Sequence, residues 1–175
     1  MSSNPTRGEA IRDQLREELI ALLPELRAFA HFLLREPAGA DDLVQETVMR
    51  ALAALAQFQA GTSLRAWTFT ILRNFYHEQA RRRRTERRVI EEGALAEPES
   101  PPAQHGKAEL DDLERFLWDL PPLLREALVL VGARGLGYEE AAVVCGVPIG
   151  TMKARVSRAR TRLARVMGRN SGASA

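Results

Sequence analysis

The chain has 175 residues, of which 45% are hydrophobic and 27% charged, so it is expected to fold around a core rather than be disordered or fibrous throughout. Its single cysteine excludes a disulfide framework, and its three scattered histidines have no metal-ligand spacing, so we expect no metal and no cofactor. We expect no signal peptide and no membrane segment, which favours the cytoplasm.

The net charge of +2 conceals a pattern along the chain. Residues 61–88 contain eight Lys and Arg against two Asp and Glu, and residues 150–175 contain seven against none. Between them, residues 89–126 contain three basic residues against ten acidic ones. Two basic blocks around an acidic one predict two separate contacts with a polyanion, joined by a segment that a polyanion would repel.

Weak strand signals and an abundance of Ala, Leu, Arg and Glu predict an all-α chain with two small helical domains. Residues 1–88 form the first domain. A flexible acidic linker with several prolines follows at 89–108, because its composition cannot bury enough apolar area to order itself. Residues 109–169 form the second domain, and 170–175 form a disordered tail.

In the first domain, apolar residues at helical spacing begin near Leu15 and restart after Pro24, which suits the first turn of a helix. The Pro-Ala-Gly segment at 37–39 should end this stretch. Asp41 or Asp42 should cap the next helix.

A further apolar stripe indicates the buried face of that helix and consists of Val44, Val48, Ala51, Leu55 and Phe58. The Gly-Thr-Ser segment at 61–63 breaks it. Another helix should then run from about Leu64 to Arg84, carrying Trp67 and ending in an arginine run.

In the second domain, an apolar pattern restarts after the Pro-Pro pair at 121–122 and includes Leu124, Leu128 and Val131. Ala142 lies four residues before Gly146, and apolar Met152 follows six residues after it. This is the spacing of a helix-turn-helix, in which the alanine allows close packing and the glycine supplies a left-handed turn.

The helix that starts near Met152 has the pattern of a DNA recognition helix. Its apolar stripe includes Val156, and its opposite face centres on the small residues Ala154 and Ser157. Flanking cations should reach phosphates, with Lys153 or Arg158 placed to test base edges. A merely solvated basic helix is the alternative.

The first basic block follows a group of aromatic and amide side chains. Phe58, Trp67 and Asn74 lie near the 61–63 loop and the arginine run, a mixture that suits stacking and hydrogen bonding to unpaired bases. A plain core role for Trp67, and a solvated face for the arginines, remain open.

Several motifs occur in the order typical of one protein family: DDLVQET at 41–47, LRAWTFTILRN at 64–74, LPP at 120–122, and YEEAA at 138–142 followed by GTMKAR at 150–155. From about residue 10 to residue 168 the chain resembles an extracytoplasmic-function (ECF) RNA polymerase sigma factor of the sigma-70 family. It is most similar to the alphaproteobacterial general-stress-response branch.

The resemblance implies a sigma-2 domain, a sigma-4 domain and a function in promoter recognition and melting, without catalysis. In the family, the DLVQE helix docks on the β′ clamp, which implies polymerase contacts at Asp42, Gln45, Glu46 and Met49. The matching minus-ten positions are Phe58, Gly61, Thr62, Ser63, Leu64, Arg65, Trp67, Arg73, Asn74, Arg81, Arg82, Arg83 and Arg84. The matching minus-thirty-five positions are Thr151, Lys153, Ala154, Arg155, Ser157, Arg158, Arg160 and Arg162.

The implied partners are core RNA polymerase, through its β′ clamp and β flap, promoter DNA, and an inhibitory anti-sigma protein. No small-molecule substrate is implied. Family linkers thread through the RNA exit channel, so the acidic linker here would imitate RNA, and an ordinary spacer is the alternative.

Two other classes of protein compete with the sigma factor hypothesis. A stand-alone helix-turn-helix regulator would bind duplex operator as a dimer, but it leaves the first domain unexplained. A nuclease or recombinase would need clustered carboxylates or a nucleophile beside a base, and the sequence shows neither.

Overall fold

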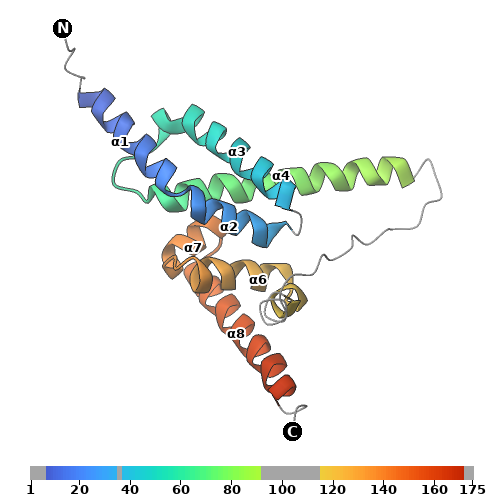
Figure 1. Cartoon of the computed structure of the whole chain (residues 1–175). Helices are drawn as coiled ribbons and strands as arrows, with labels where there is room; N and C mark the ends of the chain where they lie inside the picture. The colour runs from blue at the N-terminus through green and yellow to red at the C-terminus, as the bar shows by residue number, and fades with distance from the viewer. Residues whose placement is uncertain (1–6, 35–36, 92–114, 172–175) are drawn as a thin grey trace. The chain divides into compact units, whose positions relative to one another are not determined.

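The computed structural model describes residues 7–34, 37–91 and 115–171 (Figure 1). Every regular element within these ranges is a helix, which confirms the all-α prediction. Contacts divide the chain into two compact units, Met1–Ala80 and Arg81–Ala175. None of the described helices is both long and apolar enough to cross a bilayer.

The first unit opens with two helices, α1 (Arg7–Ala21) and α2 (Leu23–Leu33). Pro24 lies in the first turn of α2, as predicted, where a backbone N–H would have no intrahelical partner. The two helices contribute to the core with the side chains of Leu19, Leu26, Phe29 and Ala30.

Helix α3 (Pro37–Ala54) begins earlier than predicted. Helix α2 ends at Leu33, so the predicted break before α3 is present. The 37–39 segment forms the first turn of α3, however, so the predicted cap at Asp41 or Asp42 is wrong. Pro37 is compatible with a first turn because its fixed φ is already helical. Asp41 therefore lies inside α3, with Oδ1 3.6 Å from Nε of Arg27.

The buried face of α3 only partly follows the predicted stripe, because Val48 and Phe58 are half-buried. Val44, Ala51 and Leu55 are buried as expected. Leu43 and Thr47 are also fully buried, and the Thr47 hydroxyl donates a hydrogen bond to the Leu43 carbonyl at 2.7 Å. A polar side chain is thus accommodated in the core because it bonds to its own helix.

A tight turn connects α3 to the next helix. The turn starts with one 3-10 turn, η1 (Leu55–Gln57), and contains Gly61 at φ +89°. Helix α4 (Leu64–Glu91) follows, with the Ser63 hydroxyl accepting a hydrogen bond from the Ala66 N–H at 3.1 Å. Ser63 therefore caps α4, which explains why the predicted break ends there.

Helix α4 is longer than predicted, because it continues past Arg84 to Glu91. No Gly or Pro occurs between these two residues to end it. The first three residues assigned to the linker are therefore helical. The rest of the predicted linker, 92–108, and the predicted tail at 172–175 lie outside the described residues.

The second unit contains a helical run at 115–119, then α6 (Pro122–Leu128) and one π-helical turn, η2 (Val129–Ala133). The predicted stripe is only partly right here. Leu124 is buried as expected, but Leu128 and Val131 are half-buried. The fully buried side chains of this stretch are those of Ala127, Val129 and Leu130. The buried face therefore includes 127 and 130 rather than the predicted 128 and 131.

The helix-turn-helix prediction is confirmed. Helix α7 (Tyr138–Cys145) ends at Gly146, which adopts φ +62°, and helix α8 (Ile149–Ser171) follows. The Val147 N–H donates to the Ala142 carbonyl at 3.0 Å, as in a left-handed helix cap. α8 extends two residues into the predicted tail.

Candidate polymerase and nucleic-acid interfaces

The predicted polymerase contacts lie together on the outer face of α3, opposite its buried stripe. Asp42 and Gln45 are exposed, and Glu46 is half-buried. Met49 is 67% exposed, which is unusual for a large apolar side chain. Leu52, 44% exposed, extends this face by one turn and was not predicted. Acidic and apolar groups therefore share one solvent-facing surface.

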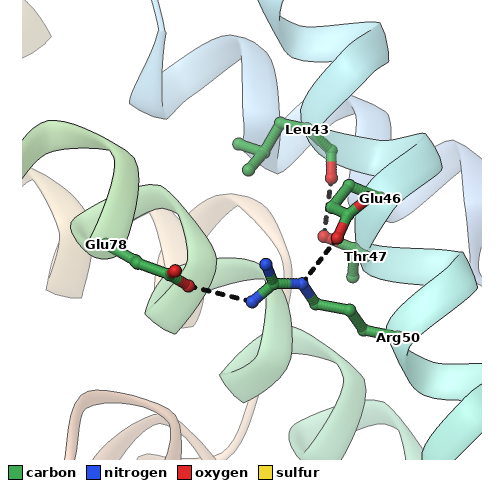
Figure 2. A network of polar contacts seen from close by, with 5 residues as sticks. All are labelled: Leu43, Glu46, Thr47, Arg50 and Glu78. Carbon is green, nitrogen blue, oxygen red and sulfur yellow. Dashed lines mark hydrogen bonds and ion pairs between the residues drawn. The ribbon is translucent and has the colours of Figure 1, made fainter. Parts of the chain in front are cut away.

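A network of charged groups borders this face (Figure 2). Arg50 donates from Nε to Oε1 of Glu46 at 2.8 Å and from Nη1 to Oε2 of Glu78, on α4, at 2.9 Å. Its guanidinium lies 4.1 Å from the ring centroid of Phe75. The bonds to Glu46 and Glu78 raise the pKa of Arg50 above its already high usual value. This cation therefore stays charged and joins α3 to α4.

Sequence reasoning missed this network. The i,i+4 spacing of Glu46 and Arg50 was visible and typical of a helical ion pair. The link to Glu78 spans 28 residues, and no local pattern indicates it.

The turn before α4 brings the predicted aromatic pair together. The ring centroids of Phe58 and Trp67 are 5.4 Å apart, and both side chains are half-buried. Gly61 and Thr62 are exposed at the tip of the turn. Leu64 is buried, at 7% exposed, so its side chain belongs to the core and we remove it from the predicted minus-ten contacts.

Arg65 was predicted to contact DNA, and in the free chain it bonds to another helix. Its Nε donates to Oε2 of Glu25, on α2, at 2.8 Å, and Nη2 donates to the same oxygen. Nearby, the rings of Phe29 and Phe69 pack with centroids 5.3 Å apart. The ion pair and the ring contact hold the start of α4 against α2.

The remaining predicted minus-ten residues follow along α4. Arg73 is half-buried and Asn74 is exposed. Arg81, Arg82, Arg83 and Arg84 are exposed. Four neighbouring guanidinium groups form a basic surface suited to phosphate oxygens.

Helix α8 has the two faces that its sequence predicts. The buried face consists of Met152, Val156 and Ala159, each 0% exposed. The exposed predicted contacts are Lys153, Ala154, Ser157, Arg158, Arg160 and Arg162, whereas Thr151 and Arg155 are half-buried. The exposed face thus carries small residues with long cations beside them.

Two local contacts set the start of the helix-turn-helix. The Gly137 N–H donates to Oε2 of Glu140 at 3.2 Å, which caps the first turn of α7. The Lys153 ammonium lies 6.0 Å from the ring centroid of Tyr138, so a cation of α8 is close to the start of α7.

Two family models match successive parts of the chain. The family model of sigma-70 region 2 matches residues 19–86, and that of sigma-70 region 4 matches residues 110–163. The chain is 45% identical over 157 residues to the ECF RNA polymerase sigma factor EcfG of Rhodopseudomonas palustris, covering 90% of this chain and 87% of the relative. The chain belongs to the ECF RNA polymerase sigma factors. As a sigma factor, it binds core polymerase and directs promoter recognition.

Two solved structures have the same fold. The sigma factor RpoE from Bartonella quintana, in complex with the anti-sigma factor NepR, matches with a TM-score of 0.73 and 44% identity, covering 89% of this chain and 97% of that one. CnrH, in complex with the cytosolic domain of CnrY, matches with a TM-score of 0.62 and 27% identity over 90% and 87% of the two chains. The expected likeness to the alphaproteobacterial stress-response branch is confirmed.

These matches decide between the competing classes of protein. A stand-alone helix-turn-helix regulator does not account for the region 2 match at 19–86 and is not favoured. Sigma factors are not a class of enzyme. In the described ranges, no three His, Cys, Asp or Glu side chains form a group that could hold a metal ion.

Proposed function

We propose that this sigma factor serves a stress regulon and binds the β′ clamp through Asp42, Gln45, Glu46 and Met49. The exposed outer face of α3 supports this assignment, since carboxylates there can pair with basic side chains of the polymerase. The adjacent side chain of Met49, 67% exposed, offers apolar area to the same partner.

The turn at 58–63 and the start of α4 hold an unpaired base of the minus-ten element. Phe58 and Trp67 supply stacking surfaces beside exposed Thr62, and stacking offsets the few kcal/mol, roughly, that unstacking a base costs. The four arginines at 81–84 bind the phosphate backbone. This combination suits melted rather than duplex DNA.

Helix α8 enters the major groove of the minus-thirty-five element. Ala154 and Ser157 let the helix approach the base edges closely, because their side chains are small. Lys153 and Arg158 flank them and contact bases or phosphates. The C-terminal unit also contacts the β flap, as the family resemblance implies.

An anti-sigma protein holds this sigma factor inactive until the stress signal arrives. RpoE, which shares its fold at 44% identity, was solved in complex with the anti-sigma factor NepR. We infer that the chain acts in the cytoplasm, where RNA polymerase works, and that it catalyses no reaction.

The observation that carries the proposal is the presence, on one chain, of an exposed acidic and apolar face, a basic helix beside paired aromatic rings, and a helix-turn-helix. The test is run-off transcription with core RNA polymerase lacking sigma, accompanied by a pull-down of the core. Wild type is compared with Glu46→Lys and Arg158→Ala. Glu17→Lys and Arg12→Ala, on exposed positions of α1, repeat the same charge changes away from both faces.

We expect promoter-dependent transcripts from wild type and from both α1 controls. Glu46→Lys should lose core binding, and Arg158→Ala should keep core binding but lose promoter binding. If Glu46→Lys binds core as wild type does, the α3 assignment is wrong. If Arg158→Ala transcribes normally, its assignment to the minus-thirty-five element is wrong.

A further inference from the structure

The network of Glu46, Arg50 and Glu78 has a role beyond joining two helices. We propose that Arg50 is a positioning residue, which holds the Glu46 carboxylate in the orientation that core polymerase binds. This inference rests on the proposed contact between Glu46 and the polymerase. It adds a residue that is absent from the predicted interface.

The hydrogen bonds of Glu46 divide its carboxylate into a held oxygen and an available one. Oε1 accepts the bond from Arg50 Nε at 2.8 Å. Oε2 has no hydrogen-bond partner among the residues that the structure describes. A carboxylate fixed through one oxygen presents the other in a defined direction, which suits a single basic side chain of a partner.

Arg50 is itself fixed from the side away from Glu46. Its Nη1 bonds to Oε2 of Glu78 at 2.9 Å, and its guanidinium lies 4.1 Å from the centroid of Phe75, a ring that is only 8% exposed. Both anchors belong to α4. Figure 2 shows Arg50 extending from α3 toward α4, with Glu46 on one side and Glu78 on the other. The orientation of Glu46 therefore depends on a second helix.

The exposure of the network argues that its main effect is on binding. The side chains of Arg50 and Glu46 are 41% and 40% exposed, and ion pairs as exposed as these contribute little to folding. Binding is more sensitive, since a long side chain that is already ordered loses less entropy when a partner arrives. Glu46 is one turn from exposed Met49, so the fixed carboxylate and the apolar side chain can contact the same surface of a partner.

The test is a double-mutant cycle on the affinity of the full chain for core RNA polymerase, measured by fluorescence anisotropy at two salt concentrations. The variants are Glu46→Gln, Arg50→Gln, Arg50→Lys and the double variant Glu46→Gln/Arg50→Gln. Arg16→Gln is the matched control, because Arg16 forms a similarly exposed ion pair with Asp13 on α1. Thermal melting of each variant reports whether it is folded at the temperature of the assay.

We expect Arg50→Gln to weaken core binding by about two- to tenfold, the range that corresponds to ordering one long side chain on binding. Arg50→Lys, which keeps the charge but reaches one carboxylate at a time, should lie between wild type and Arg50→Gln. In the Glu46→Gln background, Arg50→Gln should cause no further loss. The loss should persist at high salt, where a change in long-range charge is screened.

Three results overturn the inference, and they differ in what else they affect. If Glu46→Gln weakens binding while Arg50→Gln does not, or if the two losses multiply in the double variant, Arg50 does not act through Glu46. If Glu46→Gln binds as tightly as wild type, the proposed polymerase contact at Glu46 fails, and the role of Arg50 fails with it. A loss in Arg16→Gln equal to that in Arg50→Gln would also refute the positioning role.

Discussion

Replacing Gly146 with alanine tests whether the turn of the helix-turn-helix requires a left-handed residue. Gly146 has φ +62° and ψ +39°, and a Cβ added there meets no atom within 4 Å. The cost is therefore that of the backbone alone, about 1–2 kcal/mol for a residue with a Cβ. Alanine also lowers the conformational entropy of the unfolded chain, which raises the free energy of unfolding by about 0.5 kcal/mol. We expect Gly146→Ala to lower the free energy of unfolding by about 1 kcal/mol.

Gly150→Ala is the matched control, because it is the same substitution four residues later. Gly150 lies in the first turn of α8, and its added Cβ also meets no atom within 4 Å. Helical backbone suits alanine, so this variant should be more stable than wild type by about 0.5 kcal/mol. The free energy of unfolding should therefore be lower than that of wild type in Gly146→Ala and higher in Gly150→Ala.

Urea unfolding followed by tryptophan fluorescence measures both effects. The chain has two tryptophans, so a Trp67→Phe background leaves Trp118 as the reporter of the C-terminal unit. Trp118 suits this purpose because the Arg125 guanidinium lies 3.8 Å from its ring centroid, a contact that unfolding removes. Equal stability of Gly146→Ala and wild type, or an equal loss in Gly150→Ala, would refute the backbone argument.

Three further predictions concern the core and the two DNA surfaces. Met152→Ala, at a fully buried position, should lower the free energy of unfolding by about 2–5 kcal/mol. Lys153→Ala, at an exposed position, should change the free energy of unfolding by less than about 0.5 kcal/mol and weaken binding to a duplex minus-thirty-five site. Similar unfolding midpoints for the two variants would contradict this prediction. Glu25→Gln removes the ion pair with Arg65 and should reduce promoter opening in permanganate footprinting while duplex binding is unchanged. Normal opening would show that the ion pair does not position the turn. Arg84→Gln should lower the slope of log affinity against log salt for a single-stranded minus-ten oligonucleotide by about 0.7, and an unchanged slope would exclude a phosphate contact.

The helix-turn-helix was predictable because its signals are local. The separation of Ala142 and Gly146 depends on the geometry of one turn, and the structure places the glycine in the left-handed region. The buried face of α8 follows from the helical period, and Met152 and Val156 lie on it as expected. In both cases the sequence pattern and the packing obey the same short-range geometry.

Element boundaries were less predictable, because several residue types fit either side of them. The Pro-Ala-Gly segment at 37–39 predicts the end of one helix, yet a proline is equally suited to the first turn of the next. The extension of α4 to Glu91 replaces an expected linker start, since an acidic sequence does not by itself end a helix. Helical spacing predicts burial of Leu128 and Val131, but the neighbouring Ala127 and Leu130 are buried instead, a difference of one residue that periodicity alone does not resolve.

The charged network around Arg50 was beyond the reach of sequence reasoning for a different reason. Its contact with Glu78 depends on how α3 and α4 pack, and packing brings together residues that are distant in the chain. Arg65 illustrates the same limit, because its partner Glu25 is 40 residues away. The motif around Arg65 indicated a DNA-binding segment without showing which of its cations are already engaged.

Cys145 can report on local opening of the helix-turn-helix. It is the only cysteine of the chain and lies at the end of α7, 6% exposed. Because the thiol is buried, a maleimide alkylates it efficiently only when the packing around the end of α7 opens, so the labelling rate of the unmodified protein measures how often this part of the motif opens. The same burial gives a low labelling background, so a second cysteine introduced on an exposed helix can carry a dye selectively.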